Sequence, residues 1–286
     1  MCPLDRKSLG EYETAWCPGC GNFGILEAVK DALVRLDADM RRTVLVSGIG
    51  QAAKLPQYLK CNYYNGLHGR ALAAATGIKL ANRDLTVLIT SGDGDIFAEG
   101  GNHFIHAVRR NLDMTLIVHD NQVYALTKGQ ASPMSDPGYT TETQPFGVIN
   151  EPCHALAMAI ALGCGFVARS FSGDKEHLSA MIQEAVRFKG FSLVDVLQPC
   201  LTFNKKNNFM WYKQRIEPLP GDYDFHNKAW AIEKALQWGD KIPVGVIYRQ
   251  DGRPTYEEAC GLMQDKSILE KGPNPAGLND LLNEFR

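Results

Sequence analysis

Three short apolar runs, rich in β-branched residues, constrain the fold of this chain more than any other feature. They occupy residues 43–50, 85–95 and 114–121. Runs of this length and composition predict buried strands. Because buried strands that alternate with helices are typical of parallel sheets, we expect a doubly wound α/β fold with a mostly parallel sheet. The helical patterns around these strands lie at 22–36, where Asn22 is a candidate cap, and at 69–82 and 100–111.

The pattern continues to about residue 200 and then changes. We expect a helix near 154–163, a strand at 165–169, a helix at 175–188 and a strand at 191–197. The last 86 residues are rich in Asn, Lys, Pro, Tyr and Trp and show one clear helical pattern, near 228–237. The sequence therefore predicts one α/β domain over residues 1–200 and an extension over 201–286 that packs on this domain or on a partner subunit.

Composition and charge exclude several classes of protein. The 286 residues include 30 basic and 32 acidic side chains, and 45% of the residues are hydrophobic. A near-neutral chain of this kind predicts a globular protein that binds neither nucleic acid nor a membrane surface. No run approaches the roughly 18 apolar residues of a membrane span, and the first residues lack the apolar core of a signal peptide. We therefore expect a cytoplasmic protein.

Polar residues follow two of the predicted strands. Gly92, Asp93, Gly94 and Asp95 come after one strand, and 26 residues separate the Gly-Asp-Gly from Asn121, which follows the next strand. In open α/β sheets, ligands bind at the carboxyl ends of strands. Glycines let a phosphate approach the backbone, and carboxylate and amide oxygens are ligands that Mg²⁺ prefers. These loops predict a diphosphate cofactor with its Mg²⁺; for the glycine loop alone, a polar turn is the alternative.

The eight cysteines indicate metal binding, because disulfides are rare in a reducing compartment. Cys17 and Cys20 form a C-x2-C pair ahead of a glycine, which suits zinc or an iron–sulfur cluster. A zinc site ordinarily adds a second close pair, whereas 40 residues separate Cys20 from Cys61 and 138 separate Cys61 from Cys200. This spacing favours a cluster, with zinc as the alternative. The cysteines at both ends of the apolar stretch 153–164 are interpreted as core residues.

Seven sequence blocks, taken in order, resemble one enzyme family. They run from residue 16 to about 204 and read WCPGCGNFGIL, SGIG, LHGRALAAATGIKLAN, GDGD, GGNHFIHAVRRN, YALTKGQASPMS and QPCLTFN. Together they resemble the β subunit of two-subunit 2-oxoacid:ferredoxin oxidoreductases. The resemblance implies the diphosphate-binding domain of thiamin diphosphate enzymes. It also implies oxidative decarboxylation of a 2-oxoacid, with acyl transfer to coenzyme A and electron transfer through one 4Fe–4S cluster to ferredoxin.

The resemblance assigns the metal ligands. It gives Mg²⁺ the side chains of Asp93 and Asn121 and the carbonyl of Val123. The cluster ligands of the family match three cysteines directly, namely Cys17, Cys20 and Cys200.

The fourth cluster ligand departs from the family pattern. The family cysteine directly follows Gly-Ile-Gly, and this chain has Gln51 there. We expect Cys61, ten residues further on, to supply the missing thiolate. The alternatives are an oxygen ligand close to Gln51 and a labile cluster with three cysteine ligands.

The resemblance also assigns side chains around cofactor and substrate. It makes His68 a contact to the diphosphate or thiazolium region, Lys54 a cation for the substrate carboxylate, and Leu126 a wall of the substrate pocket. The alternatives are a packing or surface role for His68 and a solvated loop lysine for Lys54. His103 and His106 are interpreted as structural. The expected cofactor-binding residues are Gly50, His68, Gly69, Gly92, Asp93, Gly94, Asp95, Asn121, Val123, Leu126 and Thr127.

The family relationship implies a partner. Thiamin diphosphate is activated by a glutamate that the family takes from a separate domain, and this chain has room for only one such domain. We therefore expect an α subunit that supplies the glutamate, in an (αβ)2 heterotetramer, with 2-oxoglutarate as the favoured 2-oxoacid and pyruvate as the alternative. Two other functions stay open: a subunit of a non-oxidative thiamin decarboxylase or synthase, and a zinc- or cluster-stabilised interaction subunit.

Overall fold

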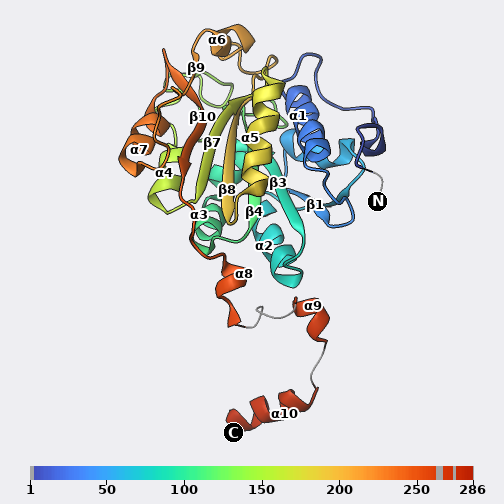
Figure 1. The fold of residues 1–286 in the computed structure, drawn as a ribbon. Coiled ribbons are helices and arrows are strands. Elements are labelled where there is room, and N and C mark those ends of the chain that lie inside the picture. Colours follow the sequence, from blue (N-terminus) through green and yellow to red (C-terminus); the bar gives the residue numbers. More distant parts are fainter. Residues whose placement is uncertain (1–2, 262–266, 273–274, 286) are drawn as a thin grey trace.

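The computed structural model describes residues 3–261, 267–272 and 275–285. At its centre lies a sheet with strand order β2-β1-β3-β4-β8-β7-β10-β9 (Figure 1). Neighbouring strands are parallel, except that β10 is antiparallel to β7. The predicted mostly parallel, doubly wound sheet is confirmed. The strands are β1 (Thr43–Ser47), β2 (Asn62–Asn65), β3 (Thr86–Gly92), β4 (Met114–Asp120), β7 (Phe166–Phe171), β8 (Phe191–Leu197), β9 (Ile216–Pro218) and β10 (Ile242–Arg249).

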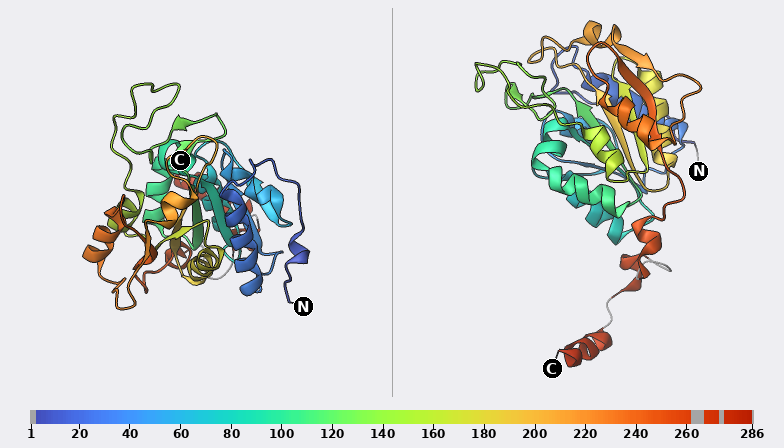
Figure 2. Two further views of the ribbon diagram at one scale, coloured as in Figure 1. Left: turned by 90° about the horizontal axis from the view of Figure 1, so that it is seen from above. Right: turned by 90° about the vertical axis from the view of Figure 1, so that its left-hand side faces the viewer.

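Helices cover both faces of the sheet, as Figures 1 and 2 show. One apolar cluster packs α1 (Asn22–Arg35), α5 (Lys175–Arg187) and the 3₁₀ helix η2 (Ala52–Tyr58) against one face. A second cluster covers the other face. Because both faces are covered, every residue of β4 and β8 is buried, which explains their continuous apolar runs. The helices of the second face are α2 (Ala71–Ala81), α3 (Gly101–Arg110), α4 (Ala155–Ala161) and α7 (Lys228–Leu236).

Local chemistry differs from the predictions at the ends of two elements. The predicted strand at 43–50 ends at Ser47, because the following glycines turn the chain into a loop. Asn22 does not cap α1, contrary to the prediction, since Gly21 precedes the helix and makes no side-chain cap. The Asn22 side chain instead points inward, where its Oδ1 lies 2.7 Å from His119 Nδ1. Asn22 therefore binds a buried polar side chain and does not cap the helix.

The sheet continues beyond residue 200. Strand β10 pairs with β7, and β9 pairs with β10, so this edge of the sheet comes from the last third of the chain. The predicted helix near 228–237 is α7, and four further helices occur among the described residues of this part of the sequence. They are α6 (Phe209–Lys213), α8 (Tyr256–Ala259), α9 (Ile268–Lys271) and α10 (Pro275–Glu284), with α10 standing apart from the sheet in Figures 1 and 2. No helix among the described residues is long and apolar enough to cross a membrane.

These positions predict different consequences for two truncations. Removing everything after Gly272 takes away α10, whose apolar side chains are exposed, such as Leu278 at 57% and Leu281 at 54%. We expect the unfolding temperature to change by less than about 2 °C. Removing everything after Lys241 also takes away β10 and its buried side chains, so we expect no cooperative unfolding transition. Thermal unfolding followed by circular dichroism distinguishes these results. If both truncated chains lost the cooperative unfolding transition, α10 would be needed for the fold, contrary to this prediction.

Candidate functional site

The loops that follow β1, β3, β4 and β8 meet at one edge of the sheet. They begin at Gly48, Asp93, Asn121 and Gln198. All four strands are parallel, so their carboxyl ends lie together, where ligands bind in such sheets. Two cavities lie among these loops, and they contain most of the site residues that the sequence predicts.

The first cavity, which we name the GDG cavity, has an empty volume of about 470 Å³. Its polar wall is the loop after β3. Another wall is formed by β5 (Val123–Tyr124) and the segment that follows it. Of the predicted cofactor-binding residues, only Gly69 is absent from the lining. The predicted residues that line the cavity are Gly50, His68, Gly92, Asp93, Gly94, Asp95, Asn121, Val123, Leu126 and Thr127.

Asp93 and Asn121 offer oxygen atoms suited to a cation. Asp93 is buried, and its Oδ2 accepts a hydrogen bond of 2.5 Å from Ser132 Oγ. Burial raises the pKa of Asp93 to about 7. Asn121 is also buried, and its Oδ1 accepts a 3.0 Å hydrogen bond from the N–H of Val123. A buried carboxylate that forms no ion pair with any described residue fits a divalent cation, whose charge favours the ionised form.

Asp95 uses its carboxylate within the chain. Its Oδ1 accepts hydrogen bonds from the N–H of Gly69 at 2.8 Å and of Ile49 at 3.2 Å. Its Oδ2 accepts a 2.7 Å hydrogen bond from Ser91 Oγ. The carboxylate therefore connects the loop after β1 and the loop before α2 to the end of β3. Its direct partners are groups of the chain itself.

Two glycines allow this close approach. A Cβ atom at Gly48 would lie 2.0 Å from Oδ2 of Asp95. Gly69 has a φ of +67°, and its Cβ would lie 2.4 Å from the carbonyl carbon of Glu99. Both positions therefore require glycine, because a larger residue would displace the backbone or the Asp95 carboxylate.

The other predicted residues lie at the exposed side of the GDG cavity, with one exception. His68 and Leu126 line the cavity and have exposed side chains, 41% exposed for Leu126. Thr127 is exposed too, and its Oγ1 donates a 2.5 Å hydrogen bond to Gln130 Oε1. Lys54 is half-buried in η2 and lines neither cavity. The structure thus brings His68, Leu126 and Thr127 together, and leaves Lys54 apart.

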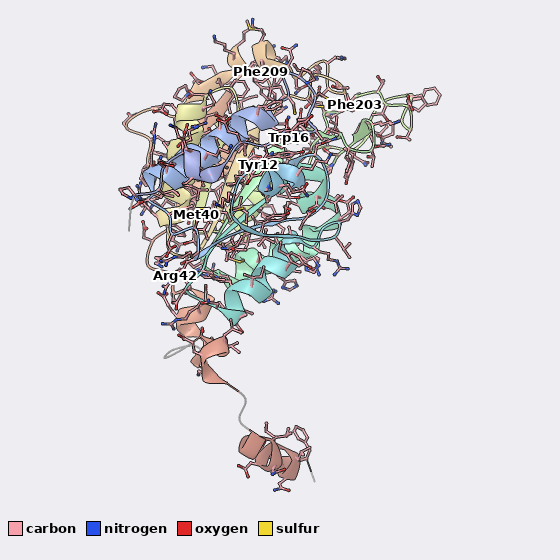
Figure 3. The ribbon with its side chains drawn as sticks, turned by 90° about the vertical axis from the view of Figure 1, so that its right-hand side faces the viewer. Tyr12, Trp16, Met40, Arg42, Phe203 and Phe209 are labelled. Carbon is pink, nitrogen blue, oxygen red and sulfur yellow. The ribbon has the colours of Figure 1, made fainter. Side chains whose placement is uncertain are left out.

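The second cavity, which we name the cysteine cavity, has an empty volume of about 420 Å³. Cys17, Cys20 and Cys200 line it together with Trp16 and Phe203, which are labelled in Figure 3. Burial, with smaller contributions from the neighbouring thiols of Cys200 and Cys17, raises the pKa of Cys20 to about 11. The described residues contain no group of three ligands close enough to hold one metal ion. Three thiols spread around a cavity suit an iron–sulfur cluster better than a single zinc ion.

Cys61 does not line the cysteine cavity. Its Sγ lies 3.7 Å from the carbonyl oxygen of Pro56 and packs against the apolar cluster below η2. Burial alone raises the pKa of Cys61 to about 12, without a contribution from any other cysteine. The structure therefore separates Cys61 from the three other predicted ligands. Cys164 is fully buried and Cys153 packs against the core, as interpreted from the sequence.

A buried chain of side chains behind the cysteine cavity was not predicted. Burial lowers the pKa of His119 to about 3, so its ring is neutral. Since Asn22 Oδ1 can only accept, His119 Nδ1 carries the proton and Nε2 accepts from Thr90 Oγ1, at 2.7 and 2.8 Å. In this arrangement Asn22 Nδ2, which is buried in the lining of the cysteine cavity, has no hydrogen-bond partner among the described residues. The sequence indicates these hydrogen-bonded side chains only through His119, a polar residue inside the otherwise apolar, buried strand β4.

The two cavities share part of their walls. Gln51, Asn121 and Ala125 line both. Gln51 belongs to the loop after β1, and Asn121 and Ala125 belong to the loop after β4. A ligand in one cavity is therefore separated from a ligand in the other by single side chains.

His119 predicts a dependence of stability on pH. Its pKa is about 3 in the folded chain and 6.5 as the ordinary value, so the unfolded chain binds the extra proton. The His119 contribution is therefore complete above pH 6.5 and is lost as the pH falls towards 3. His119→Phe keeps a ring but removes both hydrogen bonds, so we expect about 2 kcal/mol less stability at neutral pH. Between pH 6.5 and 3, the unfolding free energy of the variant should therefore fall less steeply than that of the wild type. If the two plots of unfolding free energy against pH ran parallel, this prediction would be wrong.

Two family descriptions match the chain. The C-terminal TPP binding domain of thiamine pyrophosphate enzymes matches residues 45–196, and the C-terminal part of the pyruvate ferredoxin oxidoreductase beta subunit matches residues 200–265. The first match runs from within β1 almost to the end of β8 and contains every lining residue of the GDG cavity. The second begins at Cys200 and contains β9 and β10.

Individual proteins agree with these matches. The chain is 47% identical over 257 residues to the 2-oxoacid:ferredoxin oxidoreductase subunit beta of Sulfolobus sp, covering 85% of this chain and 84% of that protein. It is 44% identical to 2-oxoacid:ferredoxin oxidoreductase 1, subunit beta, of Aeropyrum pernix, covering 98% and 92%. A solved structure of 2-oxoglutarate:ferredoxin oxidoreductase from Magnetococcus marinus, with 2-oxoglutarate, coenzyme A and succinyl-CoA bound, matches with a TM-score of 0.91 at 34% identity, covering 100% of this chain and 97% of that one. The chain therefore belongs to the β subunits of the 2-oxoacid:ferredoxin oxidoreductases.

Proposed function

We propose that this chain, with an α subunit, catalyses the oxidative decarboxylation of a 2-oxoacid with coenzyme A, and that 2-oxoglutarate is the preferred acid. The products are an acyl-CoA and CO2, and the two electrons leave one at a time to ferredoxin. The observation that carries this proposal is the wall that the GDG cavity shares with the cysteine cavity. It brings a cofactor site directly beside three thiols.

The GDG cavity is the proposed site of thiamin diphosphate and Mg²⁺. Asp93, Asn121 and the carbonyl of Val123 are the proposed Mg²⁺ ligands, and the buried, unpaired carboxylate of Asp93 supports this. Thiamin diphosphate, when bound, supplies the carbanion chemistry of the decarboxylation. His68 is the proposed diphosphate contact at the exposed side, and Leu126 the apolar wall that keeps water from the substrate.

The cysteine cavity is the proposed site of one 4Fe–4S cluster, which supplies one-electron redox chemistry. Cys17, Cys20 and Cys200 are its proposed ligands, and their position around one cavity supports this. Gln51 and Asn121, in the common wall, keep the route between the two sites short. Ferredoxin receives the electrons from the outer side, where Cys17 is exposed.

The proposed active site is shared with an α subunit, in an (αβ)2 heterotetramer. Glu99 lines the GDG cavity, but its carboxylate lies close to the hydroxyl of Tyr124, whose pKa burial and then the Glu99 charge raise. The glutamate that activates the aminopyrimidine is therefore assigned to the partner. Exposed apolar side chains beside the cavity support a covering subunit, including Leu67 at 71%.

The complex of both subunits tests this function. We expect no oxidation of 2-oxoacid by this chain alone, because the activating glutamate is missing, and CoA-dependent reduction of ferredoxin when the α subunit is added. For 2-oxoglutarate we expect a kcat/KM roughly tenfold or more above that for pyruvate, because pairing a second carboxylate contributes about 1.5 kcal/mol or more. Turnover by the isolated chain would contradict the division of the site, and equal rates with both acids would contradict the substrate.

Lys54 is the proposed cation for the distal carboxylate of 2-oxoglutarate. Lys54 does not line the GDG cavity, but it follows the lining residues Gln51 and Ala52 in the same segment and forms no ion pair with a described residue. We expect Lys54→Met to lower kcat/KM for 2-oxoglutarate about tenfold and to leave pyruvate unchanged. Lys60→Met, on the exposed end of the same loop, is the matched control. An equal loss with both acids would assign Lys54 a structural role instead.

A further inference from the structure

The number of thiols around the cysteine cavity is smaller than a 4Fe–4S cluster uses when each iron carries a thiolate. Cys17, Cys20 and Cys200 are the lining cysteines. Of the other cysteines in the described part of the chain, Cys61 packs below η2, and Cys153 and Cys164 pack in the core on the opposite face. Cys260 follows the distant helix α8. None of these lines the cavity.

Gln51 also lines the cysteine cavity, in the wall that this cavity shares with the GDG cavity. Its Oε1 atom is buried and has no hydrogen-bond partner among the described residues, although it borders the cavity. A buried polar atom without a partner is costly unless a ligand satisfies it. Asn22 Nδ2 and Gln198 Oε1, in the same lining, are unpaired as well. The cavity is thus built for a polar group that contacts Gln51.

The backbone of Gln51 is held in place. Trp16 Nε1–H donates a 2.8 Å hydrogen bond to the Gln51 carbonyl oxygen. The Trp16 ring packs edge to face against Tyr58 and Phe23, with ring centroids 4.7 and 5.4 Å apart. Because Trp16 adjoins Cys17, the same contact connects the C-x2-C segment to the loop that carries Gln51.

We propose that three irons of the cluster are bound by Cys17, Cys20 and Cys200, and that the fourth faces the Oε1 atom of Gln51 and carries no thiolate. This inference rests on the proposed function, since it takes the cluster as given. A neutral amide oxygen binds iron more weakly than a thiolate, so this one iron is released selectively. When ferricyanide removes one electron from a 4Fe–4S core of charge 2+, Fe²⁺ leaves and a 3Fe–4S core of charge 1+ remains.

The test compares variants of the anaerobically purified αβ complex after limited oxidation by ferricyanide. For the wild type we expect loss of about one iron per cluster and the electron paramagnetic resonance signal of a 3Fe–4S core. Gln51→Cys adds a thiol at the same backbone position, so it should retain its iron and show no such signal. Gln51→Ala, which removes the oxygen without adding a thiol, should convert at least as readily as the wild type.

Cys61→Ser is the matched control, because the side chain lies outside the cavity, and we expect it to behave like the wild type. A wild type as resistant as Gln51→Cys, or a Cys61→Ser variant that alone loses iron, would overturn the inference and leave the cluster itself intact. A complex without iron after anaerobic reconstitution would instead contradict the proposed function, and this inference with it.

Discussion

The carboxylate of Asp95 is the interaction on which the site depends. It accepts hydrogen bonds from Ile49, Gly69 and Ser91, so that one buried side chain positions two loops against the end of β3 at the carboxyl edge of the sheet. The glycines at 48 and 69 exist to permit this approach, since a Cβ at either position meets the carboxylate or the neighbouring backbone. Asp93, two residues earlier, forms no ion pair with a described residue and is the proposed ligand of a cation. The two carboxylates of this short motif therefore differ in their surroundings: Asp95 connects parts of the chain, and Asp93 borders the cavity.

Unpaired buried polar atoms occur both inside the sheet and around the cysteine cavity. The side chains of Thr90 and His119 have partners within the chain. Asp120 and Asp195, buried in β4 and β8, each keep one unpaired oxygen, and side-chain atoms of Asn22, Gln51 and Gln198 in the lining of the cysteine cavity are unpaired as well. Because an unpaired buried polar group costs roughly 1–3 kcal/mol, such atoms are expected where a ligand provides the missing partner. Under the proposed function, the common wall of the two cavities places decarboxylation beside electron removal.

Much of this could be predicted from the sequence. Buried parallel strands have continuous apolar runs, so β1, β3, β4 and β8 were identified, and the loops after them contain the site. The exposed edge strand β2 and the three-residue strand β9 lack that pattern. Strand β10 has an apolar run that Pro243 and Gly245 interrupt, and none of these three strands was predicted. Closeness in sequence was a poor guide to the position of Cys61. This residue follows the loop of Gln51 by ten positions, but after η2 its thiol lies against the carbonyl oxygen of Pro56 and does not line the cysteine cavity. Asn22 was expected as a cap because no local pattern reveals a partner 97 residues away.

The central claim is that a 2-oxoacid bound in the GDG cavity reduces a cluster in the cysteine cavity. The most direct test is the iron–sulfur absorption of the anaerobic αβ complex after addition of 2-oxoglutarate and coenzyme A, without ferredoxin. The account predicts bleaching in the wild type, and none in Asp93→Ala, which loses the proposed Mg²⁺ ligand but keeps all three cysteines and the same iron content. Equal bleaching in both, or none in the wild type, would contradict it.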